Sequence, residues 1–221
     1  MYTLTRMKIR GFALLILFFQ MALLLGQKPI PLLPGTAEHI FKTTEVYYLE
    51  DSGNALSFAA IRSPEQAQQF KPNERYYPKN FNRSSTYWFR VRMSFDQHVT
   101  RDRIIELFDQ TADKVEAFIP NGTGGFVHYQ AGASTDFENR QFMHKNFEFL
   151  IPALQKGTYE AYFKVRSRQM VNVILVYRTL DRFVQYTLTE YFTFGLFYGM
   201  IILFSFNNLL MYFAVRGRQY L

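Results

Sequence analysis

The segment TYWFRVRMSF places Trp88, Arg90 and Arg92 at alternating positions, and these side chains have the clearest potential chemistry in the sequence. An indole offers a flat apolar face to a sugar ring, and guanidinium groups bind carboxylates and hydroxyls. Alternate residues share one face of a β-strand, so the pattern predicts a ligand-binding face for a carbohydrate or another small ligand. The alternative is a solvated outer face with Trp88 beneath a loop.

Metal ligands are sparse in the rest of the sequence. Asp109 and Asp113 flank a predicted turn and could contribute oxygens to a calcium site, but two carboxylates without further ligands are more typical of turns. The histidines are scattered over different segments, without the spacing of a zinc motif: His39, His98, His128 and His144. We therefore expect no metal site and no cofactor.

Motifs of catalysis and nucleotide binding are also absent from the sequence. It contains no GxSxG segment, no cysteine and no P-loop or dinucleotide fingerprint. Glycoside hydrolysis is the one enzyme class that acidic residues on a sandwich leave open, and the sequence predicts a protein that is not an enzyme.

The net charge of +7 does not indicate nucleic-acid binding, because of where the charges lie. Five of the 25 basic residues flank the two long apolar runs, and all 18 acidic residues lie between those runs. The interior of the chain is therefore nearly neutral.

Between residues 41 and 177, apolar residues mostly alternate with period two, and turn residues interrupt them at short intervals. Tyr87, Phe89, Val91, Met93 and Phe95 would face the core of one such strand. Further strands are expected at 103–108, 114–119, 125–130, 142–151, 158–167 and 171–177, with one or two helical turns at 64–70. The predicted fold is an all-β, jelly-roll-like antiparallel β-sandwich followed by one C-terminal transmembrane α-helix.

The two apolar runs predict export and a membrane helix. Arg6, Lys8 and Arg10 precede the short run 11–26, which is typical of a cleaved signal peptide. Residues 192–215 carry no charge and would extend about 36 Å as a helix, which is enough to span a bilayer. Arg216 and Arg218 follow this run and favour a cytoplasmic exit.

Four small or polar residues in the second run, Gly195, Gly199, Asn207 and Asn208, predict packing against other transmembrane helices. The expected organisation is a signal peptide (1–26), a linker (27–40), an extracytoplasmic sensor domain (41–180), a juxtamembrane connector (181–191), a transmembrane helix (192–215) and a cytoplasmic tail (216–221). The chain would sit in a bacterial inner membrane as a single-pass protein, with the β-domain on the periplasmic or extracellular side.

Several segments in order also carry a family resemblance: Leu49-Glu50-Asp51, YWFRVRM at 87–93, residues 114–122, 136–149, 158–166 and 195–212. Their order resembles the bacterial seven-transmembrane receptors with diverse intracellular signalling modules, specifically their extracellular domain type 2 (7TMR-DISM extracellular 2) and first membrane helix. The resemblance implies a jelly-roll sensor similar to carbohydrate-binding modules. Only the first of the family's seven helices is present, so the resemblance implies a receptor truncated after that helix.

Two functions remain open at this point. The first is ligand sensing, with a carbohydrate or another small ligand bound outside and the signal passed through the helix to other transmembrane helices or a signalling partner. The second is an envelope module for protein interaction or structure without small-ligand binding.

Overall fold

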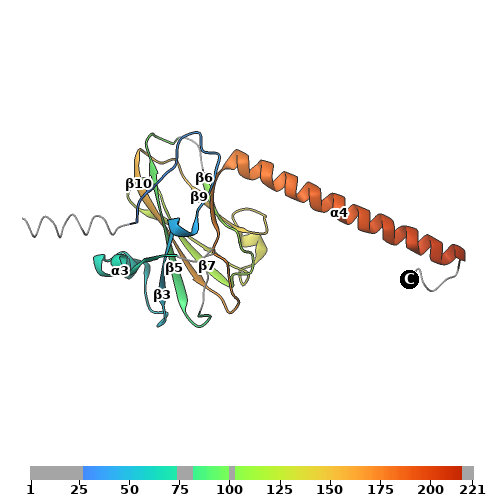
Figure 1. The fold of residues 1–221 in the computed structure, drawn as a ribbon, viewed down its shortest axis with the longest axis horizontal. Coiled ribbons are helices and arrows are strands. Elements are labelled where there is room, and N and C mark those ends of the chain that lie inside the picture. Colours follow the sequence, from blue (N-terminus) through green and yellow to red (C-terminus); the bar gives the residue numbers. More distant parts are fainter. Residues whose placement is uncertain (1–26, 74–81, 100–102, 216–221) are drawn as a thin grey trace, which may run out of the picture.

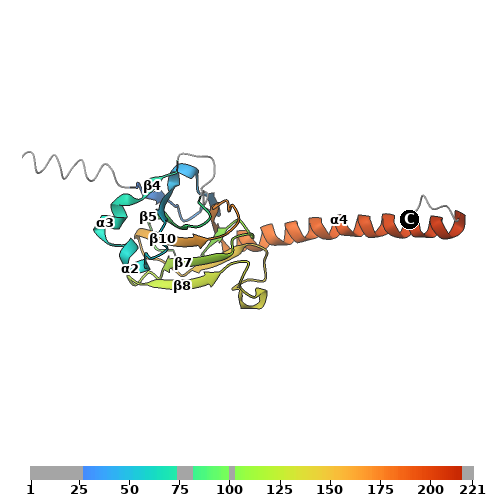
Figure 2. The same ribbon diagram turned by 90° about the horizontal axis from the view of Figure 1, so that it is seen from below.

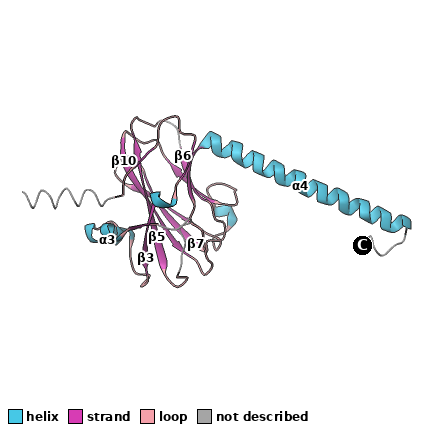
Figure 3. Cartoon of the chain, viewed as in Figure 1, coloured by secondary structure: helices cyan, strands magenta, loops and turns pink. Residues whose placement is uncertain are grey.

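The computed structural model describes residues 27–73, 82–99 and 103–215. The predicted signal peptide (1–26) and cytoplasmic tail (216–221) lie outside the described residues. Figure 1 shows a β-domain from which one long helix projects, and Figure 3 shows that strands are the main regular secondary structure of this domain.

The larger sheet contains seven strands: β1 (Ile30–Pro31), β3 (Val46–Asp51), β4 (Lys71–Pro72), β5 (Thr86–Phe95), β7 (Lys114–Pro120), β8 (Phe126–Ala131) and β10 (Gly157–Arg166). Six of them follow the order β4-β3-β5-β10-β7-β8, with antiparallel pairing throughout. The short β1 pairs with β5 in parallel.

The smaller sheet contains four antiparallel strands: β2 (Glu38–Ile40), β6 (Arg103–Leu107), β9 (Phe147–Ile151) and β11 (Leu175–Thr179). Their order is β2-β11-β6-β9. The predicted antiparallel β-sandwich with a C-terminal apolar helix is therefore confirmed, whereas the jelly-roll connectivity stays a prediction.

The helical elements are η1 (Thr43–Glu45), α2 (Phe58–Ile61), α3 (Pro64–Gln69), η2 (Phe137–Asn139) and α4 (Leu180–Val215). Serine side chains cap both short α-helices, since Ser57 accepts a hydrogen bond from the Ala60 amide and Ser63 from the Gln66 amide. Figures 1 and 2 show α3 on the side of the β-domain opposite to α4.

The main core lies between the two sheets. Tyr87, Phe89, Val91, Met93 and Phe95 of β5 face it, each 3% exposed or less, as their alternation predicts. Aromatic rings of the two sheets meet there, with the Phe149 and Phe163 centroids 5.7 Å apart.

A second hydrophobic cluster, which we call the outer cluster, covers the opposite face of the larger sheet. Its buried members are Leu49, Ile61, Phe70, Trp88, Phe118 and Tyr162. Segment 57–70 covers this cluster from the outside. Ile61 of α2 and Phe70, the C-cap residue of α3, are the buried side chains that it contributes. Strand β5 is consequently buried on both faces, as is typical of a central strand under a covering segment.

The structure differs from the sequence expectations in several places, and one of them is the strand expected at 171–177, which is β11 at Leu175–Thr179. The predicted linker 27–40 contributes β1 and β2 to the two sheets, and Leu32 is 1% exposed. The strand expected from residue 142 begins at Phe147, because residues 142–146 turn to contact α4. Strand β3 and helix α2 were not predicted, because α2 has only 4 residues and the burial of both elements depends on neighbours distant in the sequence.

Replacing Phe163 with alanine should lower the free energy of unfolding of the β-domain by about 3–5 kcal/mol, because it opens a cavity in the main core. The measurement is denaturant unfolding in detergent micelles, followed by the fluorescence of Trp88, the single tryptophan. Thr158→Ala, at an exposed position of the same strand, is the control. Equal stability of the two variants would contradict the packing described here.

Candidate functional site

The predicted binding residue Trp88 lies inside the outer cluster. Its side chain is fully buried, and its ring stacks at 5.7 Å on Phe118 and at 6.4 Å on Phe58. The Lys164 ammonium lies 5.4 Å from its centroid. The indole therefore has no exposed face to offer a sugar ring in this structure, and the covering segment 57–70 occupies the place of a ligand.

The two arginines of the predicted site lie close to a surface groove. Arg90 is 7% exposed; its Nε donates to Gln27 Oε1 at 3.0 Å, and its guanidinium lies 4.4 Å from the Phe70 ring centroid. Arg92 donates from a terminal nitrogen to the Gln27 carbonyl at 3.1 Å and faces Glu160 at 3.5 Å. Gln27 therefore joins both arginines to the first residues of the described chain.

This groove has a volume of about 660 Å³ and is bounded by three segments, 27–31, 44–47 and 70–72. Tyr47, Lys71 and Glu45 bring a phenol, an ammonium group and a carboxylate to its walls. The Gln27 amide also donates to the Glu45 carbonyl at 2.7 Å, which ties one wall to another. The groove combines an aromatic side chain with polar groups of both signs, a set suited to a small polar ligand.

A second candidate site, which we call the junction cluster, lies on the outer face of the smaller sheet. Glu106 of β6 and Glu148 of β9 are direct cross-strand partners, with relative exposures of 0% and 6%. Two like charges at such a pair destabilise a sheet unless opposite charges or hydrogen bonds compensate them. The surrounding residues supply that compensation.

Glu106 receives a hydrogen bond from the Asn146 amide at 2.5 Å and an ion pair from the Arg178 guanidinium. Glu148 lies 2.5 Å from the Nδ1 atom of His144. Arg178 is a residue of β11, and its Nε also donates to Glu38 Oε2 at 2.6 Å. All four strands of the smaller sheet and the loop before β9 therefore share a single network of charges.

The first turns of α4 cover this network. Phe183 is 4% exposed and lies 5.3 Å from the His144 ring, and the ring of Tyr186 lies 4.6 Å from the Arg178 guanidinium. Glu190 Oε2 is 3.6 Å from His144 Nε2. The segment expected as a connector, 181–191, is thus helical and packs on the β-domain.

Burial raises the pKa of Glu148 above its ordinary value, and the hydrogen bond and charge of His144 and the charge of Arg140 only partly oppose this rise. At Glu38, burial acts in the same direction, but the hydrogen bond and charge of Arg178, with those of Arg182, outweigh it. The pKa of Glu38 is therefore below its ordinary value.

Glu106, His144 and Glu148 offer ligand atoms within 4.8 Å of one another, which is close enough to hold a metal ion. One oxygen of Glu106 accepts a hydrogen bond from Asn146 and the other is ion-paired with Arg178, so a metal ion would have to displace a guanidinium. The donor set fits a network of hydrogen bonds and ion pairs better than a metal centre.

The sequence reasoning missed the junction cluster. The available signal was a charged residue in an apolar strand, as at Glu106 within RIIELF. The carboxylates of Asp109 and Asp113, considered for calcium, instead accept backbone amides of Asn172 and Arg168, both at 2.8 Å. These two aspartates hold neighbouring loops together.

Among the described residues, α4 is the one helix long and apolar enough to cross a membrane. Added Cβ atoms at Gly195 and Gly199 would meet nothing within 4 Å, and Asn207 and Asn208 are exposed. At about 100° per residue, the two asparagines point in different directions around the helix. The predicted packing against other transmembrane helices stays a prediction.

Comparison with known proteins identifies the domain that carries these features. The model of the 7TMR-DISM extracellular 2 family matches residues 43–179, from η1 to the last residue of β11, which is more than half of the chain. The chain belongs to this family. No curated protein matches the chain significantly. In this 7TMR-DISM extracellular 2 domain, the matched range ends at the residue before α4, so the junction cluster belongs to the family domain and is covered by the first turns of the helix that could cross a membrane.

Glu148→Gln should change how the stability of the 7TMR-DISM extracellular 2 domain depends on pH. Because the pKa of Glu148 is raised on folding, the wild-type free energy of unfolding should fall as the pH rises from 4.5 through that raised pKa. The loss is about 1.4 kcal/mol for each unit of displacement, and Glu148→Gln should remove it. Denaturant unfolding between about pH 4 and pH 8 measures the slope.

Glu38→Gln serves as the control of opposite sign. The lowered pKa of Glu38 stabilises the folded state above the ordinary pKa, and this stabilisation is lost as the pH falls through the lowered value. The variant should therefore lower the free energy of unfolding at neutral pH and should change its pH dependence only on the acid side, below the ordinary pKa. A Glu148→Gln slope identical to the wild type above pH 4.5 would show that burial does not displace this carboxyl.

A soluble fragment of residues 27–191 should be more stable than one of residues 27–179. The shorter fragment loses Phe183, whose burial contributes about 1.5–3 kcal/mol, and exposes the junction cluster. Thermal unfolding of the two fragments makes the comparison, with Phe183→Ala in the longer fragment as an intermediate case. Equal unfolding temperatures would mean that the first turns of α4 do not stabilise the domain.

Proposed function

We propose that this chain is the extracytoplasmic ligand-sensing part of a bacterial membrane signalling receptor, with α4 as its first transmembrane helix. The ligand is a carbohydrate or another small polar molecule, and the domain is a non-catalytic sensor. The β-domain lies on the periplasmic side of the inner membrane, as the export-type N-terminus and the arginines after residue 215 favour.

The observation that carries this proposal is the continuity between β11 and α4. Strand β11 pairs with both β2 and β6, and Leu180, the first residue of α4, follows its last residue directly. The Thr179 hydroxyl accepts the Arg182 amide at 3.1 Å and caps the first turn. A change in the orientation of the smaller sheet would therefore be passed on to α4, because no flexible linker between them would absorb the displacement.

The groove bounded by segments 27–31, 44–47 and 70–72 is our candidate for the ligand site. Behind its wall, the charge of Arg90 meets the neutral Gln27 amide, the Ala67 carbonyl and the Phe70 ring. A ligand rich in hydroxyl or carboxylate oxygens would find hydrogen-bond donors in the ammonium groups of Lys28 and Lys71, which are both exposed and line the groove. Trp88 supports this site from below, because it anchors the cluster that includes Phe70.

A glycan array probed with the chain in detergent micelles tests this function. The chain must include residues 27–31, because they form one side of the groove. We expect Lys71→Ala to weaken binding of a captured glycan by about tenfold to a hundredfold, the effect of one hydrogen bond to a charged group. The fold of the variant is checked through the Trp88 emission.

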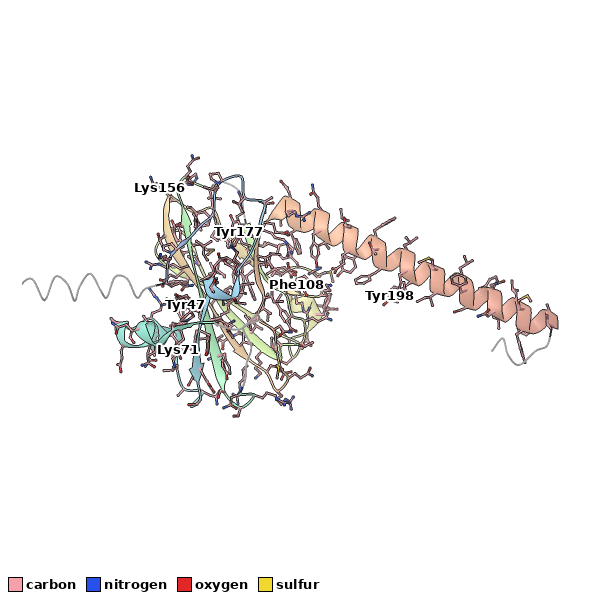
Figure 4. All side chains as sticks on the ribbon, viewed as in Figure 1. Tyr47, Lys71, Phe108, Lys156, Tyr177 and Tyr198 are labelled. Atoms are coloured by element: carbon pink, nitrogen blue, oxygen red, sulfur yellow. The ribbon has the colours of Figure 1, made fainter. Side chains whose placement is uncertain are left out.

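Lys156→Ala is the matched control, an exposed lysine that Figure 4 shows well away from Lys71 and Tyr47. It should bind as the wild type does. Equal weakening by both substitutions would refute the groove as the ligand site. Absence of any captured glycan would rule out the carbohydrate class and favour an envelope module for protein interaction.

A further inference from the structure

The segment between β8 and β9 contacts α4 as far along the helix as residues 190–194, where its uncharged run begins. The Lys145 ammonium binds Glu190 Oε1 at 2.5 Å and lies 5.7 Å from the Phe194 ring centroid. The His144 ring lies 5.9 Å from that of Tyr191. Because Glu190 is the last charged residue before the run 192–215, this segment lies level with the start of the span.

The pictures show the same arrangement. In Figure 1, the yellow segment that contains η2 lies on the side of the β-domain from which α4 projects. In Figure 4, Phe108 lies between the bulk of the β-domain and the helix that carries Tyr198. Lys156 lies at the far side of the domain in that view.

This part of the surface exposes large apolar side chains. Met143 is 73% exposed and Phe137 is 45% exposed, within the same loop as the contacts to α4. Phe108, which lies 5.6 Å from the Lys145 ammonium, is 37% exposed. Exposed apolar side chains that gather near a membrane helix fit the boundary between headgroups and acyl chains.

We propose that residues 137–145 rest on the outer surface of the bilayer that α4 crosses, with Met143 and Phe137 inserted among the lipid headgroups. Lys145 would then lie at headgroup level, where its ammonium remains hydrated beside Glu190. This inference rests on the membrane crossing of α4 proposed above, and it adds a second contact between the β-domain and the membrane.

Apolar insertion, and not attraction to anionic lipid, is the basis of this contact. The charges at this contact balance, since Glu138 of the segment opposes Arg140 and Glu190 of α4 pairs with Lys145. A surface without net charge gains little from acidic headgroups, whereas burial of apolar area is independent of them. Vesicles of phosphatidylcholine alone should therefore support the contact.

The absence of cysteine in the chain permits a direct test. The full chain carrying Met143→Cys, labelled with an environment-sensitive nitrobenzoxadiazole fluorophore, is reconstituted into phosphatidylcholine vesicles. We expect blue-shifted emission that loses about half its intensity or more when the lipid is brominated in its acyl chains, because the label lies in the upper part of the bilayer. The label at Phe137→Cys should respond in the same direction.

Three positions serve as controls. Lys156→Cys and Leu33→Cys, the latter at an apolar side chain that is 59% exposed, should not be quenched by the brominated lipid. Tyr198→Cys, within the span, should be quenched more strongly than Met143→Cys. Quenching by lipid bromine separates contact with the membrane from packing against the protein, since both shift the emission.

The outcomes distinguish this inference from the membrane crossing. If the labels at residues 143 and 137 were no more quenched than the label at residue 156, while the label at residue 198 was quenched, the surface contact would be refuted and the crossing would stand. If the label at residue 198 were also unquenched, both would be refuted. Quenching at residue 33 equal to that at residue 143 would show adsorption without orientation and would also refute the contact.

Discussion

Two carboxylates lie opposite each other in the smaller sheet, and the junction between the β-domain and α4 depends on how their charges are compensated. Glu106 and Glu148 are cross-strand partners and are both buried. Without the Arg178 guanidinium and the His144 ring, repulsion between the two carboxylates would destabilise the pairing of β6 with β9. Because those partners also touch α4, the same network that stabilises the sheet fixes the helix to it.

The two faces of the larger sheet explain why the proposed ligand site does not lie on an open strand face. One face packs in the main core, and the outer cluster covers the other, so β5 presents neither face to solvent. Of the two arginines near Trp88, Arg90 is buried and Arg92 reaches the surface at the margin of this cover, where Gln27 contacts both. A site at this margin would also include residues 27–31, which follow the predicted signal peptide, in the wall of the groove.

The groove and the junction cluster lie on different sheets, and the sandwich core connects them. A ligand in the groove would act on segments 44–47 and 70–72 of the larger sheet, whereas α4 continues from the smaller one. Close packing between the sheets transmits displacement, because buried side chains have little free volume to absorb it. Contact of residues 137–145 with the bilayer would give the β-domain a second fixed point, so a displacement would act as rotation or tilt of α4.

The sequence alone determined the elements whose signal is local. The alternation in β5 defined which side chains face the core, the uncharged run 192–215 defined the apolar helix, and the order of segments along the chain indicated the family. These properties follow from the periods of strand and helix and from the length needed to cross a bilayer.

Tertiary structure alone decided what covers each face. The alternation that put Trp88 and Arg90 on one face was correct, and a loop over Trp88 was one of the two alternatives, but no local pattern identified segment 57–70 as that cover. Likewise, Glu106 and His144 are separated by 38 positions in the numbering and meet only through the β6–β9 pairing and the turn before β9. Burial and the meeting of charges depend on contacts between distant segments, and a pattern of neighbouring residues does not contain them.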